Sequence, residues 1–475
     1  MHELHFPWIE VAILLPLLGA AWVSQIRDPI VARWHCLVFA ALAFLSAQAE
    51  AQDFYSLHSY QATDHWHLMT KLIGRELFEI DELSVPLVPL TALLYLLTAL
   101  ATLRTKVPRF SFSMMLVSES IVLALFSAVD HWVVIMLLIA STIPPYLELK
   151  GRGRPTRLYA LSMSASSLLI LFGWYLVEAA GRHPQSVWTL LPLLVGVSIR
   201  CGIFPFQSWL SDLFENATFG TALLMTTPLV GAYAALRLVV PVAPDSALRW
   251  LGLASLLTAV LASALSMVQK DVRRFFCCMI ISHTGMVLIG LEVANPIGLT
   301  GALCVWLSAG VSLGGFGLTL RALEARRGRL LLTHYQGLYE HAPALAICFL
   351  LMGLGCVGFP GTIGFIGTEM LTDGAVEAYP LVGPLIVIAA TFNGIAILRA
   401  YFLLFTGATY ESSVSLKIGG RERIAVLTLA ALVLGGGLVP QYGVSSAYHA
   451  AEVLIKRRAE SHLATPGNPP VDHVP

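Results

Sequence analysis

The chain has 475 residues, of which 57% are hydrophobic and only 12% are charged. Soluble proteins carry about a quarter charged residues and must cover their surface with polar groups, so this composition excludes a soluble fold. Lysine plus arginine and aspartate plus glutamate both number 29, so the chain lacks the positive excess that nucleic-acid binding requires. The composition therefore indicates a protein of the lipid bilayer.

The polar residues give no sign of a cofactor. The seven cysteines lie mostly in apolar runs without CxxC spacing, which is typical of packing residues. His65 and His67 flank Trp66, but no second cluster stands at ligand spacing, so no metal site is predicted. The sequence also lacks nucleotide-binding, haem-attachment and nucleophile motifs. We therefore expect no cofactor and no active site on this chain.

A bilayer-spanning helix needs about 20 mostly apolar residues, and the sequence contains about 14 such stretches. They predict an all-α polytopic membrane protein. In chain order, the expected spans lie near residues 9–26, 34–50, 84–103, 110–128, 130–148, 157–180, 187–209, 219–241, 247–268, 274–294, 298–320, 343–370, 380–406 and 424–442.

The spans suggest three regions. Residues 1–82 hold two helices and an external loop, and residues 83–406 form the core. Residues 407–475 hold the last span, an interfacial helix near 445–460 and a disordered proline-rich tail.

The basic residues of the loops predict the orientation of the chain in the membrane. The odd-numbered loops are basic and the even-numbered loops are nearly bare, so the odd loops face the cytoplasm and both termini lie outside the inner (cytoplasmic) membrane. The basic residues of the odd loops are Arg27, Arg33, Arg104, Lys106, Arg109, Lys150, Arg152, Arg154, Arg157, Lys270, Arg273, Arg274, Arg321, Arg326, Arg327, Arg329, Lys417, Arg421 and Arg423.

Proline interrupts two of the expected spans, the seventh at Pro205 and the twelfth at Pro360. Proline removes a backbone donor, so the freed carbonyl groups must find another partner within the membrane. The breaks lie five spans apart, so the two helices run in opposite directions. Residues from about 109 to 241 and from about 247 to 406 are therefore predicted to form two inverted five-helix repeats, an arrangement found in transporters. The alternative is that each proline only kinks a packed helix.

Four ionisable residues within the expected spans stand out: Glu119, Arg200, His283 and Glu369. Such residues cost several kcal/mol at membrane depth and are functional candidates for that reason. A buried carboxylate near a movable cation can load and release a proton, which predicts a proton pathway. The alternatives are a static ion pair between Glu119 and Arg200, and an interhelical hydrogen bond for His283.

Three further charged residues could form a proton entrance on the cytoplasmic side. Asp212 and Glu215 lie in an amphipathic link after the seventh span, and Lys270 precedes the tenth. The alternative is that they are solvated loop residues.

Several motifs resemble those of the antiporter-like proton-translocating membrane subunits. This family includes the chain M, L and N subunits of NADH-quinone oxidoreductase (complex I), Mrp antiporter subunits, and related chains of hydrogenases and of an inorganic-carbon uptake system. The likeness covers about spans 3 to 13, and chain M is the most similar. The motifs are Phe204-Pro205-Phe206-Gln207-Ser208-Trp209, Gly231-Ala232-Tyr233, Lys270-Asp271, Ser282-His283-Thr284-Gly285 and Phe359-Pro360-Gly361-Thr362.

The resemblance implies a bundle of about 14 helices in which lysines, glutamates and histidines carry protons, driven by a partner protein. By position, Glu119 matches an acidic residue of span 4, Arg200 stands in place of a lysine, and His283 matches the histidine of span 10. Other family charges are replaced by Ile139, Gln207, Leu229, Ala309 and Thr368, with Glu369 one residue late.

Three functions remain open from the sequence. The first is a membrane subunit of a complex I-like assembly, which takes part in proton translocation while a partner carries out electron transfer to quinone. The second is an energy-coupling subunit of an inorganic-carbon uptake or cation/proton antiporter complex, with sodium also open as the coupling ion. The third is a non-conducting scaffold. All three require other membrane subunits as partners.

Overall fold

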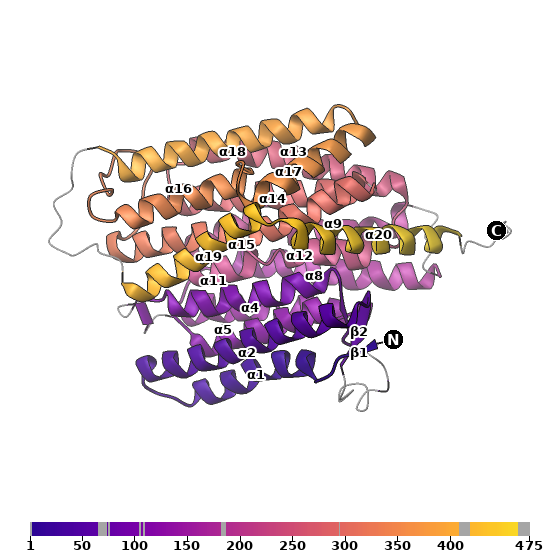
Figure 1. The fold of residues 1–475 in the computed structure, drawn as a ribbon, viewed down its shortest axis with the longest axis horizontal. Helices are drawn as coiled ribbons and strands as arrows, with labels where there is room; N and C mark the ends of the chain where they lie inside the picture. Colours follow the sequence, from indigo (N-terminus) through magenta and orange to yellow (C-terminus); the bar gives the residue numbers. More distant parts are fainter. Residues whose placement is uncertain are drawn as a thin grey trace.

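The computed structural model describes residues 2–64, 74, 77–103, 106–107, 110–181, 187–293, 295–407 and 419–463. His65, His67, the basic residues Arg104, Arg109 and Lys417, and the tail from 464 to 475 lie outside these residues. The chain forms a bundle of helices that lie side by side along one direction (Figure 1). Strand β1 and the end of α20 lie at the same end of the bundle (Figure 1).

The first half of the bundle follows the predicted spans. Its helices are α1 (Trp8–Ser24), α2 (Pro29–Leu57), α4 (Ser84–Leu100), α5 (Phe112–Ser127), α6 (His131–Ala140), α7 (Ile143–Gly151), α8 (Arg157–Ala179), α9 (Val187–Cys201), α10 (Ser208–Asn216), α11 (Phe219–Thr226), α12 (Val230–Ala234) and the π-helix η2 (Ala235–Val239).

The second half continues in the same way. Its helices are α13 (Asp245–Val268), α14 (Val272–Val293), α15 (Pro296–Arg327), α16 (Pro343–Val357), α17 (Ile363–Ala378), α18 (Val382–Phe405), α19 (Gly420–Leu438) and α20 (Gln441–Leu463).

The prediction of an all-α polytopic membrane protein is confirmed. Within the described residues, eight helical stretches are long and apolar enough to cross a membrane, and the remaining predicted spans coincide with shorter apolar helices or with α19. The small sheet of β1 (His2–Glu3), β2 (Gln61–Thr63) and β3 (Ile80–Asp81) is an addition that the sequence did not predict. In it, β1 pairs in parallel with β2, and β2 pairs antiparallel with β3.

Side-chain caps define several helix starts, because the first backbone N–H groups of a helix have no partner within it. Asp28 caps α2, Ser111 caps α5, Asp130 caps α6 and Asn295 caps α15. Each of these four caps fixes the start of a helix, and the apolar residues that follow it pack against neighbouring helices. The helix predicted near 445–460 forms as α20, which follows α19 at a bend of 74°.

The breaks predicted at Pro205 and Pro360 are both confirmed. Helix α9 ends at Cys201 and α10 begins at Ser208, while α16 ends at Val357 and α17 begins at Ile363. Side chains form hydrogen bonds with backbone groups at the first break. Trp209 Nε1 donates to the Ile199 carbonyl group at 2.8 Å, and the Phe204 N–H group donates to the Thr258 hydroxyl group at 3.0 Å. These bonds satisfy polar groups that lipid could not satisfy.

A third break, not predicted from the sequence, interrupts the eighth span. Helix α11 ends at Thr226, and Leu229 adopts a left-handed conformation with φ of 52° before α12 begins. Such a φ is unusual for a branched residue. Trp306 Nε1 donates to the Pro228 carbonyl group at 3.1 Å, which holds the break against α15. The signal in the sequence was the Thr227-Pro228 pair within an apolar run.

Three helical stretches form the centre of the bundle. Buried residues make up 94% of the most apolar part of α14, of α15 and of the stretch from α11 to η2, whereas they make up 33% of that part of α8 and of α18. Polar side chains on α14 and α15 are therefore surrounded by protein, and those on the exposed faces of α8 and α18 are not.

Candidate functional site

Glu119 lies in the middle of α5 and is fully buried. Neither of its carboxylate oxygens has a hydrogen-bond partner among the described residues. It lies within electrostatic range of Cys36 on α2 and Tyr95 on α4. The adjacent Ser118 hydroxyl group is 2.7 Å from the Tyr95 hydroxyl group. An unpartnered carboxyl group in this position is costly and remains a candidate proton carrier.

Arg200 lies near the end of α9, just before the first break, and is also buried. Its guanidinium group donates to Ser141 Oγ at 2.5 Å and to the sulfur of Met163 at 3.0 Å. These two contacts leave it without an ion pair to Glu119, so the predicted alternative of a static pair is wrong. Helix packing separates the two residues, since α9 packs mainly on α8 while α5 packs on α1.

His283 lies midway along α14 and is buried. Its Nδ1 atom is 2.8 Å from the Met279 carbonyl oxygen, and its Nε2 atom is 2.8 Å from the Cys356 carbonyl oxygen. In a continuous helix the Cys356 carbonyl group would accept from the residue four positions later, which is Pro360 and has no N–H group. His283 therefore occupies the backbone acceptor that the second break frees.

Further polar side chains surround this break. Asn393 of α18 donates to Ser282 Oγ at 2.9 Å, while its own amide oxygen is buried without a partner among the residues described. Ser282 donates in turn to the Ala259 carbonyl group of α13 at 3.0 Å. The sequence analysis missed Asn393, although a single asparagine within an apolar span is a signal that could have been used.

Glu369 is exposed on α17 and does not join the other candidates. Asp373 and Glu377 are also exposed, one and two helical turns further along. The neighbouring Thr368, which stands at the position of the family charge, donates to the Gly364 carbonyl group at 2.9 Å. The structure thus places Glu369 on the outer surface of this chain.

The predicted entrance residues lie near one another at the end of α10 and the start of α14. Burial raises the pKa of Asp212, and a hydrogen bond from Asn216 partly offsets this effect. A hydrogen bond from Arg274 lowers the pKa of Glu215, despite partial burial, and Arg329 contributes to the same shift.

Arg274 lies 2.9 Å from the Glu215 carboxylate group. Lys270 is exposed.

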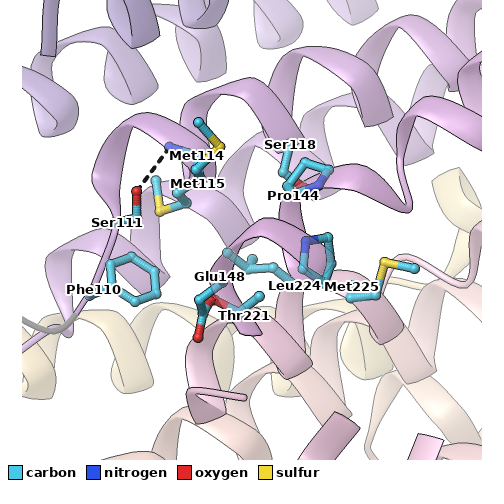
Figure 2. Close-up of a pocket in the computed structure, with 11 residues that line it drawn as sticks. Phe110, Ser111, Met114, Met115, Ser118, Pro144, Glu148, Thr221, Leu224 and Met225 are labelled. Atoms are coloured by element: carbon cyan, nitrogen blue, oxygen red, sulfur yellow. Dashed lines mark hydrogen bonds between the residues drawn. The ribbon is translucent and has the colours of Figure 1, made fainter. Parts of the chain in front are cut away.

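A small cavity near Glu119 was not anticipated from the sequence. Its volume is about 20 Å³, and Ser118 and Glu148 are among the residues that line it (Figure 2). Glu148 of α7 accepts hydrogen bonds from the Thr218 N–H group at 2.8 Å and from the Thr221 hydroxyl group. A cavity of this size can hold a water molecule.

A second cavity of about 30 Å³ lies beside Arg200, Thr226 and Thr284, and Met225 lines both cavities. Met225 therefore lies between the two cavities. The first cavity is lined by Ser118, next to Glu119, and the second by Thr284 of α14.

Buried acidic residues near the sheet were not predicted from the sequence. Glu50 of α2 is fully buried, with both carboxylate oxygens unpartnered among the described residues, and it lies within electrostatic range of Asp64. The predicted second span ended at residue 50, whereas the helix continues to Leu57, so Glu50 lies inside it. Within the described residues, the structure contains no group of side chains that could hold a metal ion.

The fold and the buried polar groups at its helix breaks define a polytopic membrane protein of the transporter type. Residues 158–393 match the family model described as "NADH:quinone oxidoreductase/Mrp antiporter, TM". The chain is 30% identical to NADH-quinone oxidoreductase subunit 13 of Thermus thermophilus over 370 residues, which cover 72% of this chain and 78% of that protein. It is 25% identical to NAD(P)H-quinone oxidoreductase chain 4 3 of Trichormus variabilis over 98% of this chain and 94% of the relative.

Solved structures agree with this match. A chain of respiratory complex I from Thermus thermophilus superimposes with a TM-score of 0.81 at 25% identity, covering 95% of this chain and 99% of that one. A chain of the Mrp complex from Dietzia sp. superimposes with a TM-score of 0.82 at 17% identity, covering 96% and 99%, which shows a shared fold. The protein belongs to the family of NADH:quinone oxidoreductase and Mrp antiporter membrane subunits, as its motifs predicted.

Proposed function

We propose that this chain is a membrane subunit of a complex I-like assembly and that it takes part in proton translocation coupled to electron transfer by its partners. The relatives are subunits of quinone oxidoreductases, which supports other membrane subunits as partners. The distribution of basic loops supports the cytoplasmic membrane as its location, with both termini outside.

The position of His283 carries this proposal. A neutral imidazole has one N–H group and can donate to one carbonyl oxygen, whereas an imidazolium can donate to two. His283 faces two carbonyl oxygens, those of Met279 and Cys356, both at 2.8 Å. Gain or loss of one proton therefore changes the bond between α14 and the broken helix. This link couples a protonation step to a helix contact, as a proton-translocating subunit requires.

Glu119 supplies a second proton-binding group in this proposal, and the two small cavities provide room for water between its surroundings and α14. Arg200 does not act as the proton carrier, because arginine does not deprotonate in proteins. Its fixed charge instead orients polar groups such as Ser141 near the first break.

Proton flux in sealed vesicles tests the proposal. The purified chain with its co-purifying partners is reconstituted, electron transfer is started, and a pH-sensitive dye reports proton uptake. Glu119→Gln and His283→Gln should each lower flux at least tenfold, while the assembled complex remains intact. The control is Glu340→Gln, which removes a carboxylate from an exposed loop and should leave flux unchanged.

Two results would contradict the proposal. Wild-type complex without flux, despite bound and active partners, would identify the chain as a scaffold. Unchanged flux in both variants would show that neither residue carries protons. Flux that requires sodium in a potassium buffer would assign sodium as the coupling ion.

A further inference from the structure

A cavity of about 280 Å³ opens at the end of the bundle that carries the basic loops. It lies beside the C-terminal ends of α4 and α15 and the N-terminal end of α11. Its charged lining is strongly one-sided, with five basic side chains and a single carboxylate, Glu324. The five basic residues are Lys106, Arg152, Arg273, Arg321 and Arg329.

Three of these five cations are already neutralised. Each has a carboxylate group within ion-pair distance, so it contributes little to the net charge of the cavity. The pairs are Arg152 with Glu148 at 3.4 Å, Arg273 with Glu324 at 2.5 Å, and Arg329 with Asp271 at 2.6 Å.

The other two cations are not in ion-pair contact with a carboxylate of the described residues. Three carboxylates nevertheless lie within electrostatic range of Arg321, those of Glu422, Glu148 and Glu324. Arg321 donates to the Thr98 carbonyl group at 2.8 Å and to the Thr102 hydroxyl group at 2.9 Å, and its guanidinium carbon lies 5.1 Å from the centre of the Phe110 ring. None of these partners carries a negative charge. Lys106 is partly buried and has no side-chain partner among the described residues. Neither of these two charges is therefore neutralised by direct contact with a carboxylate.

Helix α11 begins at this cavity. Its N-terminal end lies there through Thr218 and Phe219, and the partial positive charge of this end already attracts the Glu148 carboxylate, which accepts from the Thr218 N–H group at 2.8 Å. Gly220 in its first turn lies so close to Arg321 that a Cβ atom there would be 3.0 Å from the guanidinium carbon. Arg321 is thus held in place at a partly enclosed space that Lys106 also lines, and an anion bound there would lower the electrostatic cost of both charges.

We propose that this cavity is a binding site for a phosphate-bearing anion. Arginine and lysine are the residues that bind phosphate oxygens most strongly. The apolar parts of Leu103, Phe110 and Phe219 also line the cavity. These apolar groups suit the glycerol of an anionic phospholipid, because the cavity lies where helices reach the membrane surface. A free phosphate could bind the same basic side chains.

Ligand titration of the purified, delipidated complex tests this site. Thermal unfolding is followed while phosphatidylglycerol, phosphatidylcholine or inorganic phosphate is added at constant ionic strength. Lys106→Gln removes a charge that has no partner in the structure, so folding should be unaffected. Lys150→Gln is the matched control, since Lys150 is exposed at the same end of the bundle and does not line the cavity.

We expect phosphatidylglycerol to raise the unfolding temperature of the wild type, with an apparent affinity about fivefold weaker in Lys106→Gln, the effect of one lysine near a charged lipid surface. Lys150→Gln should titrate like the wild type. The same pattern with inorganic phosphate would identify a free anion as the ligand. The proposal is overturned if Lys106→Gln titrates like the wild type with both probes, or if both variants lose affinity equally.

Discussion

Replacing Asp81 by asparagine should destabilise the bundle strongly, because it removes one partner of a buried ion pair. The Arg237 guanidinium group lies 2.9 Å from Asp81 Oδ1 and also donates to Ser84 and the Tyr233 hydroxyl group. The two charged side chains are only 8% and 11% exposed. Asparagine would leave the arginine charge buried with no counter-ion.

The expected loss follows from this burial. Breaking a buried ion pair by removing one partner costs about 3–5 kcal/mol. Asparagine keeps one oxygen that can accept from Arg237, so we expect a value near the lower end, about 3 kcal/mol. Removing both charges in Asp81→Asn/Arg237→Met should restore much of this loss, because the desolvation cost disappears with the charge.

Thermal unfolding of the purified complex, followed by tryptophan fluorescence, measures the effect. Asp81→Asn should lower the unfolding temperature by several degrees, and the double variant should lie closer to the wild type. Asp245→Asn is the control. Asp245 pairs with Arg458, but the Asp245 side chain is 94% exposed, so little change in stability is expected. The reasoning is refuted if Asp81→Asn unfolds like Asp245→Asn, or if the double variant is the least stable.

The same ion pair predicts that the stability of the protein depends on pH. Burial alone would raise the pKa of Asp81, but Arg237 and the hydrogen bonds from Arg237 and Ser84 outweigh it and lower the pKa below its usual value. A carboxylate with a lowered pKa contributes stability at pH values above its unfolded pKa of about 3.9, and this contribution is lost as pH falls through the lower folded value. The difference in stability between wild type and Asp81→Asn should therefore be constant from pH 5 to 8, roughly, and shrink in stronger acid.

Two packing predictions concern the core. A Cβ atom on Gly301 of α15 would lie 2.2 Å from the Leu371 backbone nitrogen of α17. Gly301→Ala should therefore cost about 1–3 kcal/mol of stability and lower the yield of assembled complex in size-exclusion chromatography. An unchanged yield and unfolding temperature would contradict this contact. Trp209→Phe removes the donor to the Ile199 carbonyl group at the first break. It should cost at least about 1 kcal/mol by thermal unfolding, whereas Trp250→Phe, an exposed control, should have no effect.

Hydropathy was sufficient to locate the membrane-spanning helices. Because lipid offers no hydrogen bonds, each span must be a helix of about 20 apolar residues, and such runs can be counted directly. Proline was informative at Pro205 and Pro360, where a helix ends, because its missing N–H group frees a backbone carbonyl group. Other prolines lie inside helices that continue past them, at Pro16, Pro89 and Pro192. The break at Pro228 was missed because residues 219–241 are long and apolar enough for one span, although Pro228 and Arg237 lie within them.

The partners of the buried charges could not be predicted from the sequence. Glu119 and Arg200 both lie in the middle of a span, but one lies near Cys36 and Tyr95 and the other bonds to Ser141 and Met163. Depth in the membrane follows from position along a helix. The neighbour that a side chain meets depends on how each helix is rotated and which helices pack against it.

The family was determined by the sequence, because its motifs lie at the helix breaks, where backbone chemistry restricts the choice of residue. Only the tertiary structure showed that His283 faces the carbonyl group freed by Pro360, or that Asp81 pairs with Arg237, 156 residues away along the chain. These contacts join helices that are distant in sequence. They form because the helices pack so that buried polar groups find partners, and local sequence carries no record of that packing.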